Sequence, residues 1–362
     1  MQTIYDLDTP ALLVDLDRLE RNINAMAQTV TNGGKALRPH TKTHKTPEVA
    51  RMQVRAGAKG LTVAKLGEAE VLADAGFDDL FIANEIVGAV KVTRLLALTE
   101  RAQVRIGVDS WEAAEPVANA AGARGVRIPV LMEVDTGLGR AGVRSELEAL
   151  ELAERMDASP GLELVGIFTH EGHLYRGKDG VDREAAPHVA NQMRALADRL
   201  AQKGIACREV SVGSTPGAPL LANEPQLTEM RPGVYVYYDR MQMRFGIPRD
   251  RCALMVLATV TSVRPDGRIL LDAGTKSLAS DSPFPNRTYG EIWEYPDLLF
   301  VGASEEHGHL QAEGKSPVKV GEKVRIIPNH ACTCVNMHDA VTAYRGETVE
   351  ATWNIAGRGK IR

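Results

Sequence analysis

Short apolar runs alternate with longer helix-like segments along the first two thirds of the chain. The segments between the runs, such as 64–75 and 183–202, are rich in Ala, Leu and Glu. Strand-like runs occur at 36–37, 60–64, 80–83, 104–108, 128–134, 164–168, 210–212 and 234–238. Strands that alternate with helices form right-handed βαβ units and a parallel sheet. Eight such runs predict an α/β fold with a (β/α)8, TIM-like barrel.

A doubly wound open sheet is the alternative fold for this pattern. Open sheets that bind dinucleotides carry a G-x-G-x-x-G turn after an early strand. No early strand of this chain is followed by such a turn. The barrel is therefore preferred, and it predicts that the chemistry lies at the C-terminal ends of the strands.

The pattern changes near residue 245, where short strands and turns replace the helices. A strand at 256–263 is followed by the turn Pro265-Asp266-Gly267 and by a second strand at 268–274. Such a strand–turn–strand pattern is typical of a hairpin. We predict a barrel domain over 14–243 and a mostly β domain over 244–362, which the N-terminal strand in 1–13 joins. A chain of 362 residues is long enough for both.

Composition narrows the classes of partner. A net charge of −4 gives no argument for nucleic acid or for an anionic membrane surface. No apolar run approaches the roughly 20 residues that cross a bilayer, and the first eight residues lack the basic and apolar regions of a signal peptide. The four cysteines do not form a disulfide framework. We therefore expect a cytoplasmic protein that binds neither nucleic acid nor a membrane.

The segment 37–47 concentrates cationic side chains before a predicted helix. It contains Arg38, His40, Lys42, His44 and Lys45. Positive neighbours and burial lower the pKa of an ammonium group, and a lysine must be neutral to attack a carbonyl. The segment suits a Schiff-base lysine, a solvated basic loop or a phosphate-binding patch, and by composition alone the solvated loop is the commonest of the three.

Polar residues also follow later strands of the predicted barrel. A glycine-rich turn with Arg140 follows 128–134, and His170 and His173 follow 164–168. The small residues Gly213, Ser214 and Thr215 follow 210–212, and Arg231 enters the last predicted strand. Imidazoles at a strand end suit stacking, metal binding or acid–base chemistry. Backbone N–H groups at a turn of small residues suit phosphate.

His330 and Cys332 stand out in the second domain. Residues i and i+2 of an extended segment point the same way, so the two side chains are expected on one face. Imidazole and thiolate suit zinc. Two ligands leave positions for water or substrate, which indicates a catalytic ion. Cys334 is a further candidate ligand that we do not favour.

Together these motifs resemble one family over nearly the whole chain. It is the fold-type III pyridoxal-phosphate (PLP) enzymes with an alanine racemase-like barrel, and within them the D-threonine aldolase and D-serine dehydratase group. The matching segments are 8–15, 38–45, 213–216, 231–233, 305–308 and 328–332.

The resemblance implies a role for each motif. Lys42, and not Lys45, matches the Schiff-base lysine. The residues expected to bind PLP are Lys42, His40, Arg140 (at the phenolate), His170 (against the pyridine ring), Gly213, Ser214 and Thr215 (as phosphate cup), Arg231 (at the pyridine nitrogen) and Tyr238. Some relatives carry a neutral residue at the position of Arg231. His330 and Cys332 match the metal pair, where certain aldolases have His-x-Asp.

The implied activity is that of a lyase with two cofactors, PLP and a divalent metal (Mn2+, Zn2+ or Mg2+). Our preferred prediction is a homodimeric D-threonine aldolase, with Lys42 and His173 as catalytic residues. The alternative is a D-serine or D-3-hydroxyaspartate dehydratase. A racemase would not need the metal pair, and a catalytically silent PLP carrier would lack the second domain.

Overall fold

The computed structural model describes residues 2–177, 180–281 and 288–362. The chain divides into two compact units. Unit 1 comprises Met1–Asn24, Thr43–Glu48 and Val234–Gly359, and unit 2 comprises Ala25–Lys42, Val49–Gly233 and Lys360–Arg362. No helix among the described residues is both long and apolar enough to span a bilayer.

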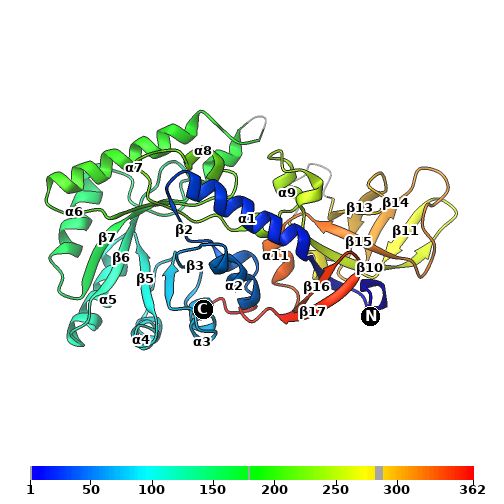
Figure 1. Ribbon diagram of the computed structural model, residues 1–362, viewed down its shortest axis with the longest axis horizontal. Coiled ribbons are helices and arrows are strands. Elements are labelled where there is room, and N and C mark those ends of the chain that lie inside the picture. The colour runs from blue at the N-terminus through cyan, green and yellow to red at the C-terminus, as the bar shows by residue number, and fades with distance from the viewer. Residues whose placement is uncertain (1, 178–179, 282–287) are drawn as a thin grey trace. The chain divides into compact units, whose positions relative to one another are not determined.

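Unit 2 contains an eight-stranded parallel sheet with the strand order β2-β9-β8-β7-β6-β5-β4-β3 (Figure 1). A parallel bridge between His40 and Thr62 joins its two end strands. The predicted α/β, TIM-like barrel is thereby confirmed. Its strands are β2 (Ala36–Leu37), β3 (Leu61–Val63), β4 (Asp79–Ile82), β5 (Gln103–Val108), β6 (Ile128–Glu133), β7 (Leu162–Phe168), β8 (Glu209–Val212) and β9 (Glu229–Met230).

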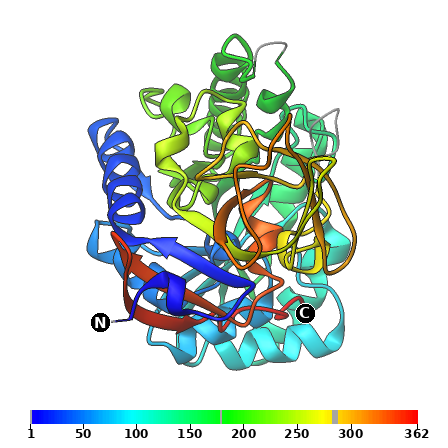
Figure 2. The same ribbon diagram turned by 90° about the vertical axis from the view of Figure 1, so that its right-hand side faces the viewer.

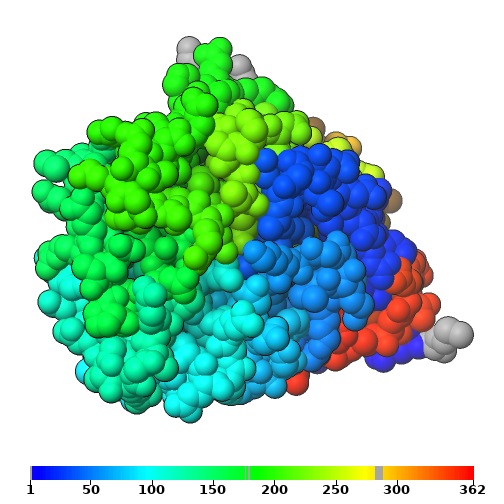
Figure 3. Space-filling view, turned by 60° about the vertical axis from the view of Figure 1, so that its left-hand side comes forward, coloured from blue at the N-terminus to red at the C-terminus, as the bar shows by residue number. Residues whose placement is uncertain are grey.

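Helices follow the strands of the sheet and bury their apolar faces against it. Side chains such as Leu95 of α4 and Val117 of α5 are fully buried, which is the main source of stability for amphipathic helices. Figure 3 shows the outer surface that these helices form. The helices are α1 (Leu16–Asn32), α2 (Pro47–Arg55), α3 (Leu66–Asp74), α4 (Ala89–Leu98), α5 (Trp111–Ala123), α6 (Glu146–Asp157), α7 (Ala185–Gln202) and α8 (Ala218–Leu221), with 3-10 turns η2 (Thr41–Thr43) and η3 (Gly172–Arg176).

The last barrel strand differs from its prediction. We predicted a strand at 234–238, but this segment begins with a 3-10 turn, η4 (Val234–Val236). The closing strand is the two-residue β9, which pairs with β2 and β8. Arg231 therefore follows the strand instead of entering it. The apolar run misled the prediction because Tyr235 and Val236 are buried without being extended.

Unit 1 contains a nine-stranded, mostly antiparallel sheet. The N-terminal β1 (Ala11–Asp15) pairs with β10 and β16, and Figure 2 shows it in blue beside the red C-terminal strands. The predicted mostly β second domain is confirmed. Its other strands are β10 (Leu254–Val263), β11 (Arg268–Leu271), β12 (Gly290–Ile292), β13 (Leu299–Ala303), β14 (Gly308–Gln311), β15 (Lys323–Pro328), β16 (Ala340–Arg345) and β17 (Thr348–Asn354).

Short helices connect the strands of unit 1. Its core includes Ile4, Leu13, Leu257 and Tyr344, which are fully buried. The helical elements are η1 (Ile4–Asp6), η5 (Arg249–Arg251), α9 (Arg240–Met243), α10 (Thr275–Leu278) and α11 (Ala331–Val335).

Candidate active site

A cavity of about 390 Å³ lies at the C-terminal ends of the barrel strands. This volume falls within the range of small-molecule sites. Each side of the barrel contributes to its wall. The lining residues are His40, Lys42, Ala64, Ala83, Asn84, Glu85, Glu133, Arg140, Ala141, Phe168, His170, Gly213 and Arg231. The barrel fold thus brings together six of the predicted site residues, because parallel strands end at one edge.

Lys42 lies in η2, the turn that follows β2. Its side chain is half-buried, and its backbone N–H lies 3.4 Å from Nδ1 of His40. Its charge also acts on His170. The lysine therefore shares a partly desolvated cavity with two imidazoles, those of His40 and His170.

His170 is fixed by the loop that follows β8. Its Nδ1 lies 2.7 Å from the carbonyl oxygen of Gly213, and because a carbonyl only accepts, Nδ1 carries the hydrogen. Burial lowers the pKa of His170 to about 4, with a further contribution from the positive charge of Lys42. The imidazole is therefore neutral at physiological pH, with Nε2 unprotonated.

Gly213 is held at both of its backbone polar groups. Its carbonyl accepts from His170, and its N–H donates to Oε2 of the fully buried Glu171 at 2.9 Å. A Cβ at this position would lie only 2.6 Å from Cβ of Arg231, so a glycine is needed. Because its N–H already donates to Glu171, Gly213 does not offer this group to a phosphate. A phosphate at the predicted cup would take its hydrogen bonds from other groups of the loop.

Ser214 and Thr215 continue this loop and are both nearly buried. The hydroxyl of Ser214 accepts from the N–H of Gly217 at 3.0 Å, which closes the turn before α8. A Cβ at Gly217 would lie 2.6 Å from the hydroxyl oxygen of Ser214 and 2.6 Å from Oε1 of Glu171. Glycines therefore keep the backbone of this loop close-packed, which is typical of loops that cradle an anion.

Arg231 is the most deeply buried cation of the cavity wall, with 4% of its surface exposed. Its Nη1 donates to the hydroxyl of Ser211 at 2.5 Å and its Nη2 to the carbonyl of Thr169 at 2.7 Å. Its guanidinium also lies 5.1 Å from the ring centroid of Phe168. Burial lowers the pKa of Arg231, while the carboxylate of Glu229 opposes that change.

Glu133 and Glu85 are cavity residues that our sequence analysis did not select. Glu133 is 4% exposed and lies 3.4 Å from Nη2 of Arg140. Burial, followed by the charge of Glu85, raises the pKa of Glu133 to about 7. Oε1 of Glu85 is buried and has no hydrogen-bond partner among the described residues. The sequence signal for Glu133 was its position at the end of β6, directly before the turn with Arg140.

His173 lies in η3, one turn beyond His170. It is not among the lining residues of the cavity. Its ring is half-buried, and Nδ1 is buried without a hydrogen-bond partner in the described part of the chain. The ring lies beside the turn after β6, where a Cβ at Gly137 would be 3.5 Å from Nε2. One ring nitrogen of His173 therefore has a hydrogen-bonding capacity that the described residues do not use.

His330 and Cys332 lie in unit 1, at the start of α11. Our reasoning that they share one face of an extended segment is wrong, because His330 is the N-cap residue of α11 and Cys332 lies in its first turn. The two side chains nevertheless interact. Burial alone would lower the pKa of His330, but Cys332, Asp239 and Asp281 together raise it to about 10. An environment that holds a proton this strongly also favours a metal cation.

Each of these two side chains has a second partner in unit 1. Nδ1 of His330 lies 2.6 Å from Oδ2 of Asp281, which leaves Nε2 for a metal, as in carboxylate–histidine–metal arrangements. The hydroxyl of Thr43 lies 3.2 Å from Sγ of Cys332. Within the described residues, no group of three or more His, Cys, Asp or Glu converges to hold a metal. Imidazole and thiolate therefore fit a divalent cation only as a pair that water or substrate oxygens complete.

Cys334 and Tyr238 also belong to unit 1. The thiol of Cys334 donates to the carbonyl of Ser277 at 3.2 Å, and burial raises its pKa, which disfavours the thiolate that a metal requires. Tyr238 is buried, with the guanidinium of Arg251 6.0 Å from its ring centroid. The role of Tyr238 at the cofactor stays a prediction.

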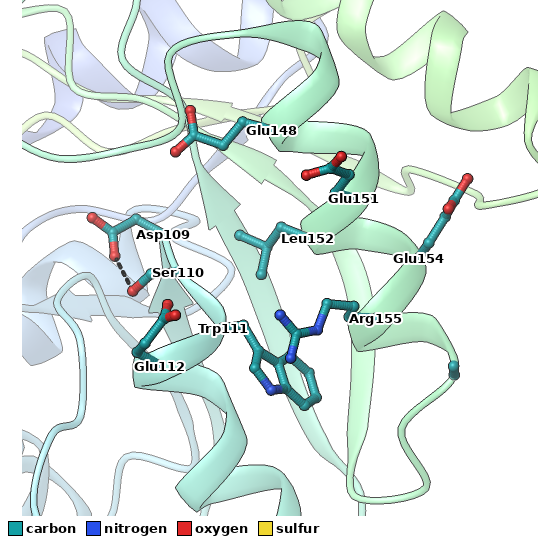
Figure 4. Close-up of a pocket in the computed structure, with 10 residues that line it drawn as sticks. Asp109, Ser110, Trp111, Glu112, Glu148, Glu151, Leu152, Glu154 and Arg155 are labelled. Atoms are coloured by element: carbon teal, nitrogen blue, oxygen red, sulfur yellow. Dashed lines mark hydrogen bonds between the residues drawn. The ribbon is translucent and has the colours of Figure 1, made fainter.

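A larger cavity of about 600 Å³ lies on the outside of the barrel, between α5 and α6. Figure 4 shows the guanidinium of Arg155 over the ring of Trp111, with Glu151 and Glu148 on earlier turns of α6. The guanidinium lies 4.5 Å from the ring centroid. None of the predicted site residues lines this cavity. Its lining comes from just after the end of β5 (Asp109 and Ser110), from α5 and from α6, and it shares no lining residue with the cavity that contains Lys42.

Two family models match the chain. The model described as alanine racemase, N-terminal domain, matches residues 14–241, and that of a putative serine dehydratase domain matches residues 253–344. The D-threonine aldolase of Arthrobacter sp is 34% identical over 98% of this chain and 94% of its own length. The D-threo-3-hydroxyaspartate dehydratase of Delftia sp. (strain HT23) is 35% identical over 97% of this chain and 98% of its own length.

Solved structures give the same result. The crystal structure of D-threonine aldolase from Filomicrobium marinum has a TM-score of 0.91 and 31% identity, with 100% of both chains covered. A cysteine-to-alanine mutant of a D-threo-3-hydroxyaspartate dehydratase, described as a metal-free form, has a TM-score of 0.89 and 33% identity over 98% of this chain and 99% of that chain.

Proposed function

Because the chain belongs to the alanine racemase N-terminal domain family, the fold-type III PLP enzymes, we propose that it is a lyase that uses PLP and a divalent metal. Its substrates would be D-β-hydroxy-α-amino acids. Within that class we propose D-threonine aldolase activity, which cleaves the Cα–Cβ bond and yields glycine and an aldehyde. A homodimer and a cytoplasmic location remain predictions.

The observation that carries the proposal is the placement of Lys42 in the barrel cavity. The lysine lies beside His40 and His170, and Arg140 and Arg231 line the same wall. A carbonyl compound with an anionic group suits this mixture of amine, imidazole and guanidinium. Lys42 would carry PLP, which supplies an electron sink for charge that develops at Cα.

The other residues of the cavity would orient the cofactor. The loop of Ser214 and Thr215 would receive the phosphate. The neutral ring of His170, fixed by its bond to Gly213, would lie against the pyridine ring. Arg140, beside Glu133, would bind the phenolate oxygen.

Proton transfer requires one further group. For retro-aldol cleavage a base must accept the proton of the β-hydroxyl, and His173 has a nitrogen without a partner among the described residues. His330 and Cys332 would hold the metal, whose chemistry is to lower the pKa of the bound hydroxyl. We assign the metal pair to catalysis because, among the described residues, no third His, Cys, Asp or Glu joins His330 and Cys332 in a group that could hold the ion.

Dehydration is the second candidate reaction. In it Lys42 would accept the α-proton, and the β-hydroxyl would leave as hydroxide, so that a keto acid and ammonia form. Cys332 favours this reading, because certain aldolases have aspartate at this position. The identity of 35% to a D-threo-3-hydroxyaspartate dehydratase supports dehydration as much as the identity of 34% to a D-threonine aldolase supports the aldolase reaction.

A product assay separates the two reactions. The protein, loaded with PLP and Mn2+ or Zn2+, is given D-threonine and D-serine, and glycine, aldehyde, keto acid and ammonia are measured. We expect acetaldehyde and glycine from D-threonine. Lys42→Ala should abolish turnover, whereas Lys45→Ala, three residues away, should retain it. Keto acid and ammonia without glycine would refute the aldolase assignment and support the dehydratase.

A further inference from the structure

A chain of buried polar side chains reaches the cavity from inside the barrel. Nε of Arg38 donates to Oε2 of Glu229 at 2.7 Å. The hydroxyl of Ser211 donates to Oε1 of Glu229 at 2.9 Å and accepts from Nη1 of Arg231 at 2.5 Å. Of these four residues only Arg231 lines the cavity. Each is at least 96% buried, since exposure ranges from 0% for Arg38 to 4% for Arg231.

The strand register brings these side chains together. Ser211 of β8 is the pairing partner of Glu229 of β9, and Leu37 of β2 pairs with Met230 of β9. Glu229 and Arg231 are two residues apart, and in an extended segment such residues point to the same side of a sheet. The chain is therefore built from three neighbouring strands, with Ser211 between the carboxylate and the cavity arginine.

Stability alone does not account for this arrangement. Buried ion pairs often contribute no more than apolar side chains of equal volume, because desolvation offsets the attraction between the charges. Arg38 is already paired with Asp79 at 2.6 Å, so Glu229 is not its sole carboxylate partner. Besides its bond to Arg38, Glu229 accepts a hydrogen bond from Ser211, and the hydroxyl of Ser211 in turn accepts one from Arg231.

We propose that Glu229, acting through Ser211, is a positioning residue that fixes the orientation and the electrostatic effect of Arg231 on the cofactor in the cavity. The inference rests on the proposed function, because it requires PLP in this cavity. Nη1 and Nη2 of Arg231 each use one N–H on Ser211 and Thr169. These two anchors set the direction of the N–H groups that remain for a ligand. Glu229 is also the carboxylate that most strongly offsets the effect of burial on Arg231.

Two variants separate the effect on the orientation of Arg231 from the effect on its electrostatic field. Ser211→Ala removes one anchor of Arg231 and leaves the charge of Glu229 in place. Glu229→Gln keeps the shape of the side chain and removes its charge. Glu209→Gln is the matched control: Glu209 lies on β8, two residues from Ser211, and is paired with Arg105 at 2.6 Å. It has no hydrogen bond to Ser211 or Arg231 among those of the described residues.

The measurements are the affinity for PLP, the pH dependence of the visible absorption of the bound cofactor, and the melting temperature of the PLP-free protein. In Ser211→Ala we expect the affinity for PLP to fall about tenfold, the effect of losing one hydrogen bond to a charged group. In Glu229→Gln we expect the midpoint of the absorption change to move to lower pH. Without the carboxylate the field of Arg231 is less compensated, and protonated forms of the cofactor are disfavoured.

The control defines the contradicting result. Glu209→Gln should lower the melting temperature through its lost ion pair and leave both cofactor measurements at wild-type values. The proposal is wrong if Glu229→Gln and Ser211→Ala also change only the melting temperature, while the wild-type protein binds PLP normally. If the wild-type protein binds no PLP, the proposed function fails together with this inference.

Discussion

At the scale of single residues, Glu133 shows how burial creates a group that titrates near neutral pH. Its pKa rises from 4.5 to about 7 in the folded protein. The folded state therefore binds more protons than the unfolded state between these values, so this group's contribution to stability falls as the pH rises through that window. Above pH 7 the ionised carboxylate destabilises the PLP-free protein by about 3 kcal/mol.

We therefore predict that Glu133→Gln stabilises the PLP-free protein at pH 8 by up to about 3 kcal/mol, and that this gain vanishes below about pH 4.5. Denaturant unfolding at several pH values measures the effect. Glu151→Gln, on the exposed face of α6, serves as the control and should change stability little at any pH. A gain that is the same at pH 5 and pH 8 would contradict the assigned pKa.

Asp281 contacts one residue of the predicted metal pair. Because it binds Nδ1 of His330 at 2.6 Å, it fixes which ring nitrogen can face a metal. We predict that Asp281→Asn weakens Zn2+ or Mn2+ binding by about 10- to 100-fold, as measured by calorimetric titration. Asp297→Asn, at an exposed position of unit 1, is the matched control. Equal metal affinity in the two variants would show that Asp281 does not orient the ligand.

At the scale of secondary-structure elements, the turn after β8 depends on a close approach between two strand ends. A methyl group at Gly213 would press on Cβ of Arg231 at 2.6 Å and would move the loop of Ser214. Gly213→Ala should therefore destabilise the protein by about 1–3 kcal/mol and weaken its binding of PLP.

Gly122 offers a contrasting position within α5. A Cβ there would meet its nearest neighbours at 3.7 Å or more, so Gly122→Ala should be neutral or stabilise the protein by up to about 1 kcal/mol. Thermal unfolding and PLP titration of the two variants test the comparison. Wild-type PLP affinity in Gly213→Ala would disprove the role given to this turn.

The elements also show where sequence reasoning succeeds and where it fails. Strands such as β5 and β6 were predictable because their apolar runs are long and bounded by helices. The strand β9 was not, because Glu229 and Met230 form a two-residue strand whose polar member faces a buried arginine. The apolar run after it misled us, since burial alone does not require an extended backbone.

At the scale of the whole molecule, the barrel and the mostly β second domain followed from the change of periodicity near residue 245. Residues of the candidate site were predictable where their type is one that enzymes commonly use for catalysis, as for Lys42 and His170. They were not predictable where the role depends on contacts between distant segments. Glu171, Glu133 and Glu229 are ordinary acids in the sequence, and only the fold places Glu133 in the cavity wall and buries Glu171 and Glu229 behind it.

The claim on which this account rests is that PLP is held by Lys42 in the barrel cavity. The most direct test is reduction of the PLP-loaded protein with borohydride, followed by proteolysis and mass spectrometry of the labelled peptide. The account predicts a single phosphopyridoxyl group on Lys42, and none in the Lys42→Ala variant. A label on Lys45 or on a lysine outside the cavity, or no label at all, would contradict it.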